Sequence, residues 1–575
     1  MENISHYLPI LKWLPSYNKS LLVSDLIAGF VVTVLLIPQS LAYAILAGVP
    51  AEVGLYASIT PLVIYALLGS SRTLSVGPVA VISLMTATTL GNIVAQGSSE
   101  YLNAAITLAA LSGIMLLLMG ILKLGLIANF LSHSVISGFI TASGVIIALS
   151  QLKHIFGVQA SGDTLSEILH TFSTHAHQTN VITLILGLCA LLFLICAKKY
   201  ATTMLRAFGL SDRTTLFLAK ISPIIAVIST ILVAYIFDLQ TYEVALVGHI
   251  PSGLPTFSLT LPSWELVKTL TLPAFFISII GYIESVSVGK TLAAKRRQKI
   301  DPNQELIGLG SANIASAIAG AFPVTGGFSR SVVNFDAGAS TQAASIFAAI
   351  GIGLAALFLT PVLFYLPKAT LAATIIVAVI SLIDLSIFKK TWKYDKHDFL
   401  AVSATVCITL FYGVEKGVSA GIIASILLHL YRASKPHIAE VGLVAGTEHF
   451  RNIRRYHVQT HPHLLSLRID ESLYFINANF LEDAIYSAIY QRDEIYHVIL
   501  MCSAVNEIDY SALETLETIN TRLASQGVTL HLSEVKGPVM DALKKSGFPK
   551  MLSGNIYLTQ FQAVNEVLKD KINCR

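Results

Sequence analysis

Two apolar segments of this chain are interrupted in the middle by glycine, proline and polar residues. Residues 74–92 contain "LSVGPVAVISLM", and residues 322–340 read "FPVTGGFSRSVVNFDAGAS". Both lie among unbroken apolar runs. Irregular backbone inside a bilayer is tolerated only where protein or a water-filled cavity surrounds it. Such a pair of segments therefore predicts a polytopic membrane domain with two half-helices that line an internal site.

The surrounding apolar runs have the length of membrane-spanning helices. The chain is 54% hydrophobic and only 13% charged, whereas soluble domains carry about 25% charged residues. Runs of about 17–25 apolar residues are long enough to cross a bilayer. With the two interrupted segments they give about fourteen spans. The unbroken ones are expected near residues 24–47, 51–69, 101–121, 126–151, 181–197, 214–237, 271–289, 303–321, 343–366, 369–385, 397–413 and 414–431.

Basic residues collect in alternate loops. The positive-inside rule assigns such loops to the cytoplasm, while the long segment 238–270 carries only Lys268 and is expected outside. Residues 1–20 and the polar C-terminal region are then both cytoplasmic. The basic residues that mark these loops include Lys12, Lys19, Arg72, Lys123, Lys198, Lys199, Arg206, Lys290, Lys295, Arg296, Arg297, Lys299, Lys389, Lys390, Lys393 and Lys396.

The interrupted segments occupy the third and tenth positions in the order of spans. Each is the third of seven, and because seven is odd the two halves have opposite topology. Such an inverted repeat with paired broken helices is typical of transporter sites. Half-helices that start near Gly77-Pro78 and Gly326-Gly327 would point their N-termini at each other. Free backbone N–H groups and the helix dipole at these ends favour an anion.

Arg330 is one turn into the second half-helix, and an arginine at this depth is expected to face a cavity or a partner. Its donors suit an oxyanion, and the Ser329 hydroxyl and the backbone of residues 326–328 add further donors. The alternatives are a pairing with a carboxylate or an extension toward the cytoplasm. Asp336 is interpreted as structural or as part of the vestibule.

Glu284 is a second charge within a predicted span. An intramembrane acid is functional by default, so Glu284 could carry a coupling proton or bind Na⁺; the alternative is a fixed counter-ion for Arg330. Gln39 and Tyr43 lie one turn apart on the first span, after Pro38, and either line the cavity or pack against other helices.

Other site types have little support. The five cysteines form no C-x-x-C pair, and the histidines of "HFRNIRRYHVQTHPH", residues 449–463, are interpreted as part of a solvated linker, so neither a metal nor a cofactor is expected. A net charge of +4 is too small to indicate nucleic-acid binding. No catalytic triad or phosphate loop is present, so an enzyme is not expected.

The chain changes composition after about residue 432. The predicted organisation is a transmembrane domain over residues 21–432, a linker over 433–445 and a cytoplasmic domain over 446–575. In the last domain, "LLSLRIDESLYFINANFLEDAIYSAI" predicts strand, turn, strand and helix. A buried strand, an amphipathic helix that ends at Gly527, another strand and another helix follow. Alternating strands and helices are typical of a small α/β domain.

Three stretches resemble the SulP family of anion transporters, the sulfate-permease group. They are "VPAEVGLYASITPLVIYALLGSSRTLSVGPVAVISLM", "DPNQELIGLGSANIASAIAGAFPVTGGFSRSVVNFDAGASTQ" and, in the C-terminal region, "SAVNEIDYSALETLETI", which is similar to the core of a STAS domain. The resemblance implies a seven-plus-seven inverted repeat. Spans 1–4 and 8–11 would form a core, spans 5–7 and 12–14 a gate, and the core would move like an elevator in a homodimer.

The resemblance also implies roles for individual residues. The anion pocket would comprise Gln39, Tyr43, Val79, Phe328, Ser329 and Arg330, and Gly77 and Gly327 at the expected starts of the half-helices are added to it as substrate-binding candidates. Glu284 matches the acidic position linked to coupling. The sodium-dependent bicarbonate branch has a hydroxyl one turn later, where this chain has Val288, which favours protons over Na⁺. Intact "FSRSVVNF" favours sulfate, with bicarbonate, chloride or dicarboxylate transport or exchange, or an anion channel, as alternatives.

The same resemblance implies a multi-pass protein of the cell (inner) membrane and a regulatory role for the C-terminal domain. Ser511 matches a serine that is phosphorylated in related bacterial regulators. Asp509 or Ser511 could instead cap the helix that follows. A cytoplasmic protein partner for this domain is a further expectation.

Overall fold

The computed structural model describes residues 8–129, 132–160, 162–207, 212–257, 262–492 and 494–570. It divides into two compact units, one that ends at Ser425 and one that begins at Ile426. Within the described residues, the first unit consists of helices and two short strands, whereas the second combines helices with a six-stranded sheet. The expected cytoplasmic N-terminus, residues 1–20, lies outside the described residues at positions 1–7.

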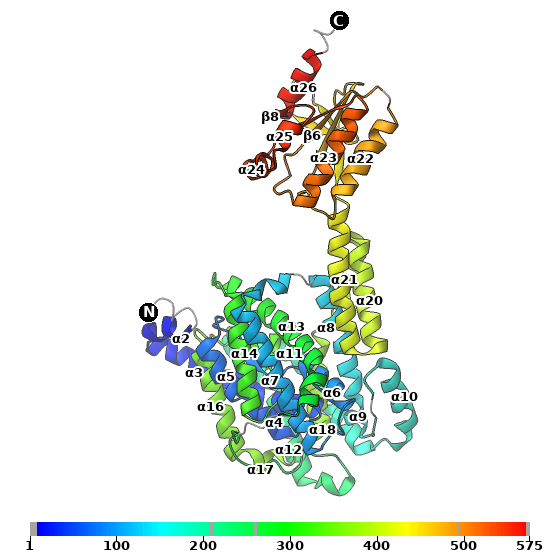
Figure 1. The fold of residues 1–575 in the computed structure, drawn as a ribbon. Coiled ribbons are helices and arrows are strands. Elements are labelled where there is room, and N and C mark those ends of the chain that lie inside the picture. Colours follow the sequence, from blue (N-terminus) through cyan, green and yellow to red (C-terminus); the bar gives the residue numbers. More distant parts are fainter. Residues whose placement is uncertain are drawn as a thin grey trace. The chain divides into compact units, whose positions relative to one another are not determined.

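Helices occupy each of the ranges expected to span the membrane (Figure 1). The expected range 51–69 holds two helices, and the range 343–366 also holds two. The helices that begin in the first unit are α2 (Ile10–Trp13), α3 (Lys19–Ala47), α4 (Ala51–Tyr56), α5 (Thr60–Leu68), α6 (Ala80–Gly91), α7 (Ser99–Ile121), α8 (His133–Ser150), α9 (Leu152–Phe156), α10 (Leu165–His175), α11 (Val181–Ala207), α12 (Asp212–Ile236), α13 (Trp264–Lys295), α14 (Pro302–Ile318), α15 (Phe328–Asp336), α16 (Ala343–Phe358), α17 (Thr360–Leu363), α18 (Lys368–Ile380), α19 (Ser386–Tyr394), α20 (Lys396–Tyr412) and α21 (Val414–Ser434).

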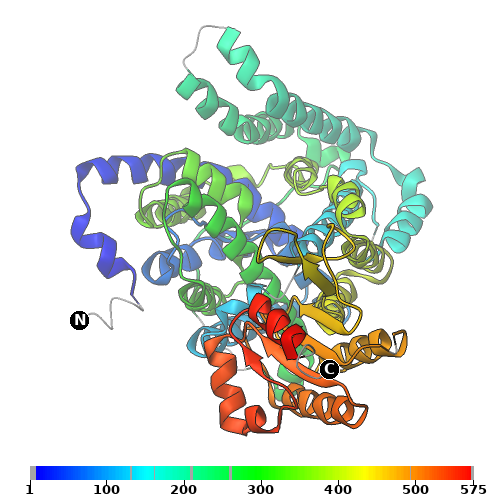
Figure 2. The same cartoon turned by 90° about the horizontal axis from the view of Figure 1, so that it is seen from above.

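Length and composition allow seven helical stretches of the described chain to cross a membrane. They are Lys19–Ala47, Ala51–Leu68, Ser99–Ile121, Ser134–Phe156, Val181–Met204, Trp264–Lys295 and Val414–Ser434. Shorter apolar helices include α6, α16 and α18. Figure 2 shows α11 and α12 side by side, in agreement with their packing. The count of fourteen spans and the inverted repeat remain predictions.

The two interrupted segments meet through a short antiparallel pair of strands. β1 (Val76–Gly77) pairs with β2 (Thr325–Gly326), with Val76 opposite Gly326 and Gly77 opposite Thr325. The second half-helix, α15, starts where the sequence predicts. The first, α6, starts at Ala80 rather than at Gly77-Pro78. The reason is that the backbone of residues 76 and 77 is extended in the strand pair, so the helix can begin only after Pro78.

A buried carboxylate holds the approach to β1. Glu305 of α14 is fully buried. It accepts hydrogen bonds from the Tyr65 hydroxyl at 2.8 Å, from Ser70 N and Oγ at 2.9 and 2.7 Å and from Ser71 N at 3.0 Å. α14 itself packs between α7 and α5 (Figure 1). A buried charge with this number of donors is well compensated, so Glu305 fixes the end of α5 against α14.

The second unit is an α/β domain. Its strands β3 (Ile438–Leu443), β4 (Phe450–Asn452), β5 (Leu464–Ile469), β6 (His497–Met501), β7 (Thr529–Ser533) and β8 (Ile556–Tyr557) form one sheet in the order β4-β3-β5-β6-β7-β8. β5 to β8 are parallel, and β3 and β4 are antiparallel to their neighbours. Parallel strands joined by helices explain why this region alternates between apolar strand and helix patterns.

Helices cover both faces of this sheet (Figure 1). On β6, Val498 and Leu500 pack with one helical layer, whereas Ile499 packs with the opposite layer. This follows from the two-residue period of a strand. The first layer contains α22 (Ala478–Tyr490), α23 (Tyr510–Ser525) and α24 (Gly537–Ser546), followed by α25 (Phe548–Met551), and the opposite layer contains α26 (Gln560–Asp570).

Three expectations for this region are wrong. The range 433–445, expected as a linker, contains β3, whose backbone pairs with both β4 and β5. The histidine-rich stretch 449–463 contains β4 and bridges to the sheet through Gln459 and His461, so it is not a free linker. No second strand follows β5 within "DESLYFINANF"; only the isolated bridge of Leu473 to Ile508 occurs there. In the first two cases pairing with neighbouring strands, which the local composition does not show, decides the conformation.

Asp470, Arg468 and His437 form an ion cluster at one end of the sheet. Asp470 accepts hydrogen bonds from Arg468 Nε at 2.5 Å and from His437 Nδ1 at 2.7 Å. Partial burial opposes ionisation, but these bonds outweigh it and hold the pKa of Asp470 below its usual value. The stabilisation is therefore present above the unfolded-state pKa of about 3.9 and is lost as the pH falls through the lower folded-state value.

We expect Asp470→Asn to speed hydrogen exchange in β3 and β5 of the full-length protein about fivefold at pH 7, which corresponds to about 1 kcal/mol. Asp541→Asn, at an exposed position of α24, is the matched control. Equal exchange in the two variants at pH 7 would contradict a stabilising role for Asp470.

Candidate functional site

The strand pair β1–β2 brings the N-termini of the two half-helices together. Because the strands are antiparallel, α6 and α15 leave opposite ends of the pair. Val79 and Gly327 are the N-cap residues, and neither helix has a side-chain cap. The first N–H groups of a helix have no partner within the helix. Two uncapped N-termini at one crossing therefore form a place where backbone donors and two helix dipoles favour negative charge.

Arg330 lies at this crossing, with only 2% of its surface exposed. Its Nη2 donates to Thr325 O at 3.2 Å. Its Nη1 is buried and has no hydrogen-bond partner among the described residues. A guanidinium has five N–H donors, so this side chain keeps donor capacity for a ligand. The expected alternative, extension to the cytoplasm, is not what the structure has.

Glycines make the room for this guanidinium. A Cβ at Gly77 would lie 2.8 Å from Arg330 Nη1, and a Cβ at Gly327 would lie 2.8 Å from Nε. Real Cβ atoms do not approach so closely without a shift. Both glycines thus allow the arginine to sit against the backbone of the strand pair. Their contribution to the site is space for Arg330.

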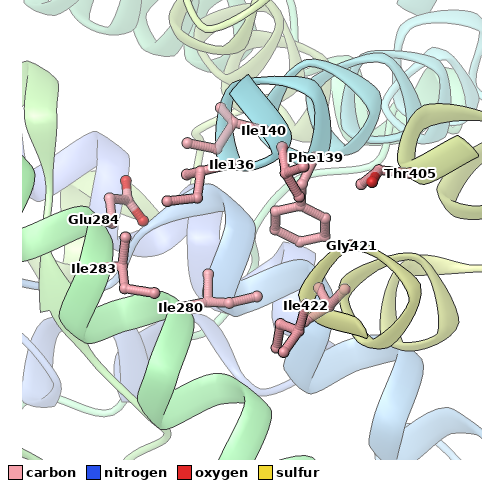
Figure 3. Close-up of a pocket in the computed structure, with 11 residues that line it drawn as sticks. Ile136, Phe139, Ile140, Ile280, Ile283, Glu284, Thr405, Gly421 and Ile422 are labelled. Carbon is pink, nitrogen blue, oxygen red and sulfur yellow. The ribbon is translucent and has the colours of Figure 1, made fainter. Parts of the chain in front are cut away.

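Glu284 is the other charged group near the crossing. It is half-buried on α13, and its Oε2 is buried without a hydrogen-bond partner among the described residues. Figure 3 shows its carboxylate facing Ile136 and Ile140 of α8. These side chains border a small apolar cavity of about 30 Å³. An acid in such surroundings lacks the donors that usually compensate a buried charge.

A larger cavity lies beside α13 between Glu284 and Lys290. Its volume is about 540 Å³, and Glu284, Val288, Lys290, Phe328 and Asp384 are among its lining residues. Phe328 is 48% exposed and Ser329 is also exposed, so the first residues of α15 lie at an open surface. The cavity therefore extends along α13 from Glu284 to Lys290 and reaches Phe328 at the start of α15.

Three of the expected site residues interact electrostatically. Tyr43 interacts with both Arg330 and Glu284, and Glu284 also interacts with Arg330. Tyr43 is 8% exposed on α3, and Gln39, one turn earlier, is half-buried. α3 packs against α6 and α15. Tyr43 therefore belongs to the same cluster as the two charges at the crossing. For Gln39 the structure gives only a half-buried position on the same helix.

The sequence does not reveal the residues that hold the crossing in place. Ser285 accepts from Gly326 N at 2.8 Å and shares a 2.7 Å hydrogen bond with Thr325, whose hydroxyl donates to Gly281 O. Ser331 Oγ accepts from Ser75 N at 3.0 Å, and Asn334 Nδ2 donates to Thr73 O at 3.0 Å. Since Ser285 follows Glu284 directly, the bonds that fix β2 also fix the acid.

Two further charges support the far end of α15. Asp25 is fully buried and accepts from Ser340 N, Thr341 N and Thr341 Oγ1 at 2.7, 3.1 and 2.6 Å. Arg296 donates to Phe335 O at 2.8 Å and to Ala339 O, which satisfies carbonyls at the helix C-terminus. Its guanidinium lies 4.2 Å from the ring centroid of Phe335. Asp336 is exposed and interacts electrostatically with Arg296.

The sequence signal that pointed to Glu284, an acid within an apolar segment, also marks two of the supporting residues. Asp25 and Glu305 are also acids within apolar segments, and such acids are rare and usually have a role. Ser285, Ser331 and Asn334 carry no comparable signal, because polar uncharged residues are common in helices.

In the second unit, Asp509 is the N-cap of α23 and accepts from Ala512 N at 2.8 Å. Ser511 lies in the first turn and is exposed. Among the described residues, no group of three or more His, Cys, Asp or Glu side chains has the arrangement of a metal site.

Comparison with known proteins matches both units. Residues 22–405 match the sulfate permease family and residues 455–563 match the STAS domain. The chain is 36% identical to chloroplastic sulfate transporter 4.1 of Arabidopsis thaliana over 557 residues, which cover 95% of this chain and 80% of the relative. It is 35% identical to the probable sulfate transporter 4.2 of the same plant, with 98% and 84% covered.

A solved structure agrees with the fold. The murine solute carrier 26 family member A9 anion transporter in the inward-facing state has a TM-score of 0.87 to this chain at 25% identity, with 99% of this chain and 95% of that chain covered. The expected helical membrane fold with a C-terminal STAS domain is confirmed, and the family match agrees with the expectation that the chain is not an enzyme. The chain is a multi-pass membrane protein of the sulfate permease family with a C-terminal STAS domain.

Proposed function

We propose that the chain is a secondary active transporter that couples the uptake of sulfate to protons. One observation carries this proposal: the buried Arg330 Nη1 and the buried Glu284 Oε2 both lack a hydrogen-bond partner among the described residues, at a crossing of two uncapped half-helices. Unsatisfied buried polar groups are costly, so such a pair is retained for a ligand. The names of the plant relatives support sulfate as the anion.

The arrangement links anion and proton binding. An oxyanion at the crossing accepts from Arg330 and from the first N–H groups of α6 and α15, with Gln39, Tyr43, Val79, Phe328 and Ser329 around it. A proton on Glu284 removes a negative charge that would repel a dianion. Each ligand therefore strengthens the binding of the other, as linkage requires. Na⁺ is disfavoured because Val288 lines the cavity where a hydroxyl would be needed.

The cavity beside Glu284 supports an inward-facing state, because Lys290, one of its lining residues, lies in the C-terminal part of α13, which leads into a basic loop. We therefore place both termini in the cytoplasm and the protein in the cell membrane. Transport proceeds by an elevator-like movement of the core, built from spans 1–4 and 8–11, against the gate within a homodimer. The STAS domain regulates transport or binds a cytoplasmic partner, and the exposed Ser511 is its candidate phosphorylation site.

Proteoliposomes test this function directly. Uptake of labelled sulfate is measured while the pH and Na⁺ gradients are varied separately. We expect accumulation with an inward proton gradient, none with a Na⁺ gradient alone, and inhibition by excess unlabelled sulfate. Uptake of bicarbonate, chloride or a dicarboxylate in place of sulfate would reassign the substrate, and no gradient dependence would indicate an uncoupled exchanger or channel.

We expect Glu284→Gln to abolish proton-driven accumulation of sulfate but to keep sulfate–sulfate exchange. Glutamine imitates the protonated acid and cannot release a proton, so anion binding should lose its dependence on pH. Glu265→Gln, at an exposed position of the same helix, is the matched control. Full accumulation by Glu284→Gln would refute the coupling role.

We expect Arg330→Ala to weaken sulfate binding by at least about tenfold, the effect of losing one hydrogen bond to a charged group. Arg330→Lys should restore only part of the affinity, since lysine retains the charge but lacks the planar set of donors. Binding is measured by isothermal titration of the purified protein. Unchanged affinity in Arg330→Ala would remove the anion site from this crossing.

We expect Gly77→Ala to weaken sulfate binding about tenfold, because the added methyl group overpacks the space of the guanidinium. Gly91→Ala, at the last residue of the half-helix that follows Gly77, is the control, since a Cβ at Gly91 meets nothing within 4 Å. If Gly77→Ala and Gly91→Ala bound sulfate equally, the space at Gly77 would have no part in placing Arg330.

A further inference from the structure

A separate polar cavity lies beside the N-terminal helix. It has a volume of about 340 Å³ and shares no lining residue with the cavity at Glu284. It is bounded by α2, by the loop after α5 and by the loop between α13 and α14. Its lining residues are Pro9, Lys12, Trp13, Ser70, Arg72, Gln298, Lys299, Ile300, Asp301, Gln304 and Gln342.

The charges around this cavity favour an anion. Lys12, Arg72 and Lys299 line it from three separate segments. Asp301 is the one acid in the lining, and its Oδ1 accepts from Asn303 N at 2.9 Å and from Gln304 N at 3.3 Å as the N-cap of α14. This carboxylate already compensates the N-terminus of a helix, so the cavity keeps an excess of positive charge.

Two uncharged groups in the lining also offer hydrogen bonds. Trp13 is 6% exposed, and its Nε1 has no hydrogen-bond partner among the described residues. Gln342 is 3% exposed; its Nε2 donates to Gly69 O at 3.1 Å, while its Oε1 is without a partner among those residues. A ligand that uses both needs an acceptor for Trp13 and an O–H or N–H donor for Gln342, in addition to a negative charge; the cations of the lining favour an uncharged hydroxyl over an ammonium group as that donor.

Exposed apolar side chains lie close to this cavity in the sequence. Leu11 and Leu14 are exposed on either side of Trp13, as in a segment that rests on a bilayer surface. The exposed apolar side chains of α3 begin at Val23, only one turn after the start of the helix at Lys19, and a turn rises about 5.4 Å. Aromatic side chains such as Trp13 and Tyr17 are enriched at this interface.

We propose that this cavity binds the phosphate and hydroxyl groups of an anionic lipid headgroup of the phosphatidylglycerol class. Lys12, Arg72 and Lys299 neutralise the phosphate, Trp13 Nε1 donates to one of its oxygens, and Gln342 Oε1 accepts from a headgroup hydroxyl. The bound headgroup ties α2 to the loop that enters β1, because Arg72 precedes β1 by only a few residues.

Tryptophan fluorescence in nanodiscs tests the proposal. The full-length protein with Trp264→Phe and Trp392→Phe retains Trp13 as its only tryptophan, since the chain has three. Brominated phosphatidylglycerol, at a low mole fraction in phosphatidylcholine, is compared with brominated phosphatidylcholine at the same fraction. We expect stronger quenching by the anionic lipid, and a preference that falls roughly fivefold for each cation removed, the value typical of a basic residue near a membrane surface.

Arg72→Gln with Lys299→Gln should therefore lose most of the preference. Lys389→Gln with Lys393→Gln, which removes two exposed cations of α19 outside the cavity, should keep it. Arg72→Lys with Lys299→Arg should also keep it, which shows that the charge and not the particular side chain at these two positions is needed. Equal quenching by both brominated lipids, or equal preference in both neutralised pairs, would overturn the proposal. Displacement of the brominated lipid by soluble glycerol 3-phosphate at micromolar concentration would show a soluble ligand and overturn the lipid assignment.

Discussion

The backbone hydrogen bonds that two broken helices give up have to be replaced inside an apolar domain. Water is scarce there, and an unsatisfied N–H or C=O group is costly. The strand pair β1–β2 replaces some of these bonds, and Gly327 N donates to Ser75 O at 3.2 Å. Asn313 binds both backbone groups of Val324: its Nδ2 donates to Val324 O at 2.9 Å, and its Oδ1 accepts from Val324 N at 2.9 Å. Without these replacements the two helix N-termini could not be held at one point.

Four charges of the first unit that are buried or half-buried fall into two groups by how completely they are paired. Glu305 and Asp25 have several donors each, and both hold loops against neighbouring helices. Arg330 and Glu284 each retain a buried polar atom without a partner among the described residues. Full pairing is what stability requires of a buried charge. Incomplete pairing is therefore the feature that separates candidate ligand-binding charges from structural ones.

One turn of α13 joins the structural and the proposed functional roles. Gly281 and Ser285 bond to β2, and Glu284 lies between them on the same turn. A shift of this turn would move the acid and the strand pair together. In the proposed mechanism the protonation of Glu284 therefore reaches the anion site through electrostatic attraction and through the backbone of β2, without a separate relay.

The sequence by itself determined which spans are broken, that Arg330 and Glu284 stand in apolar surroundings, and that an α/β domain follows. These conclusions rest on composition and on short periods of two and about four residues, which are local properties. Only the tertiary structure showed that α6 starts after Pro78, that residues 438–443 belong to the sheet, and that Gly77 and Gly327 make room for Arg330. It also decided that Glu305 is held by Tyr65, which is 240 residues away. A local pattern can show that a polar group is out of place, but the partner that satisfies it, or its lack of one, depends on which distant segments the fold brings together.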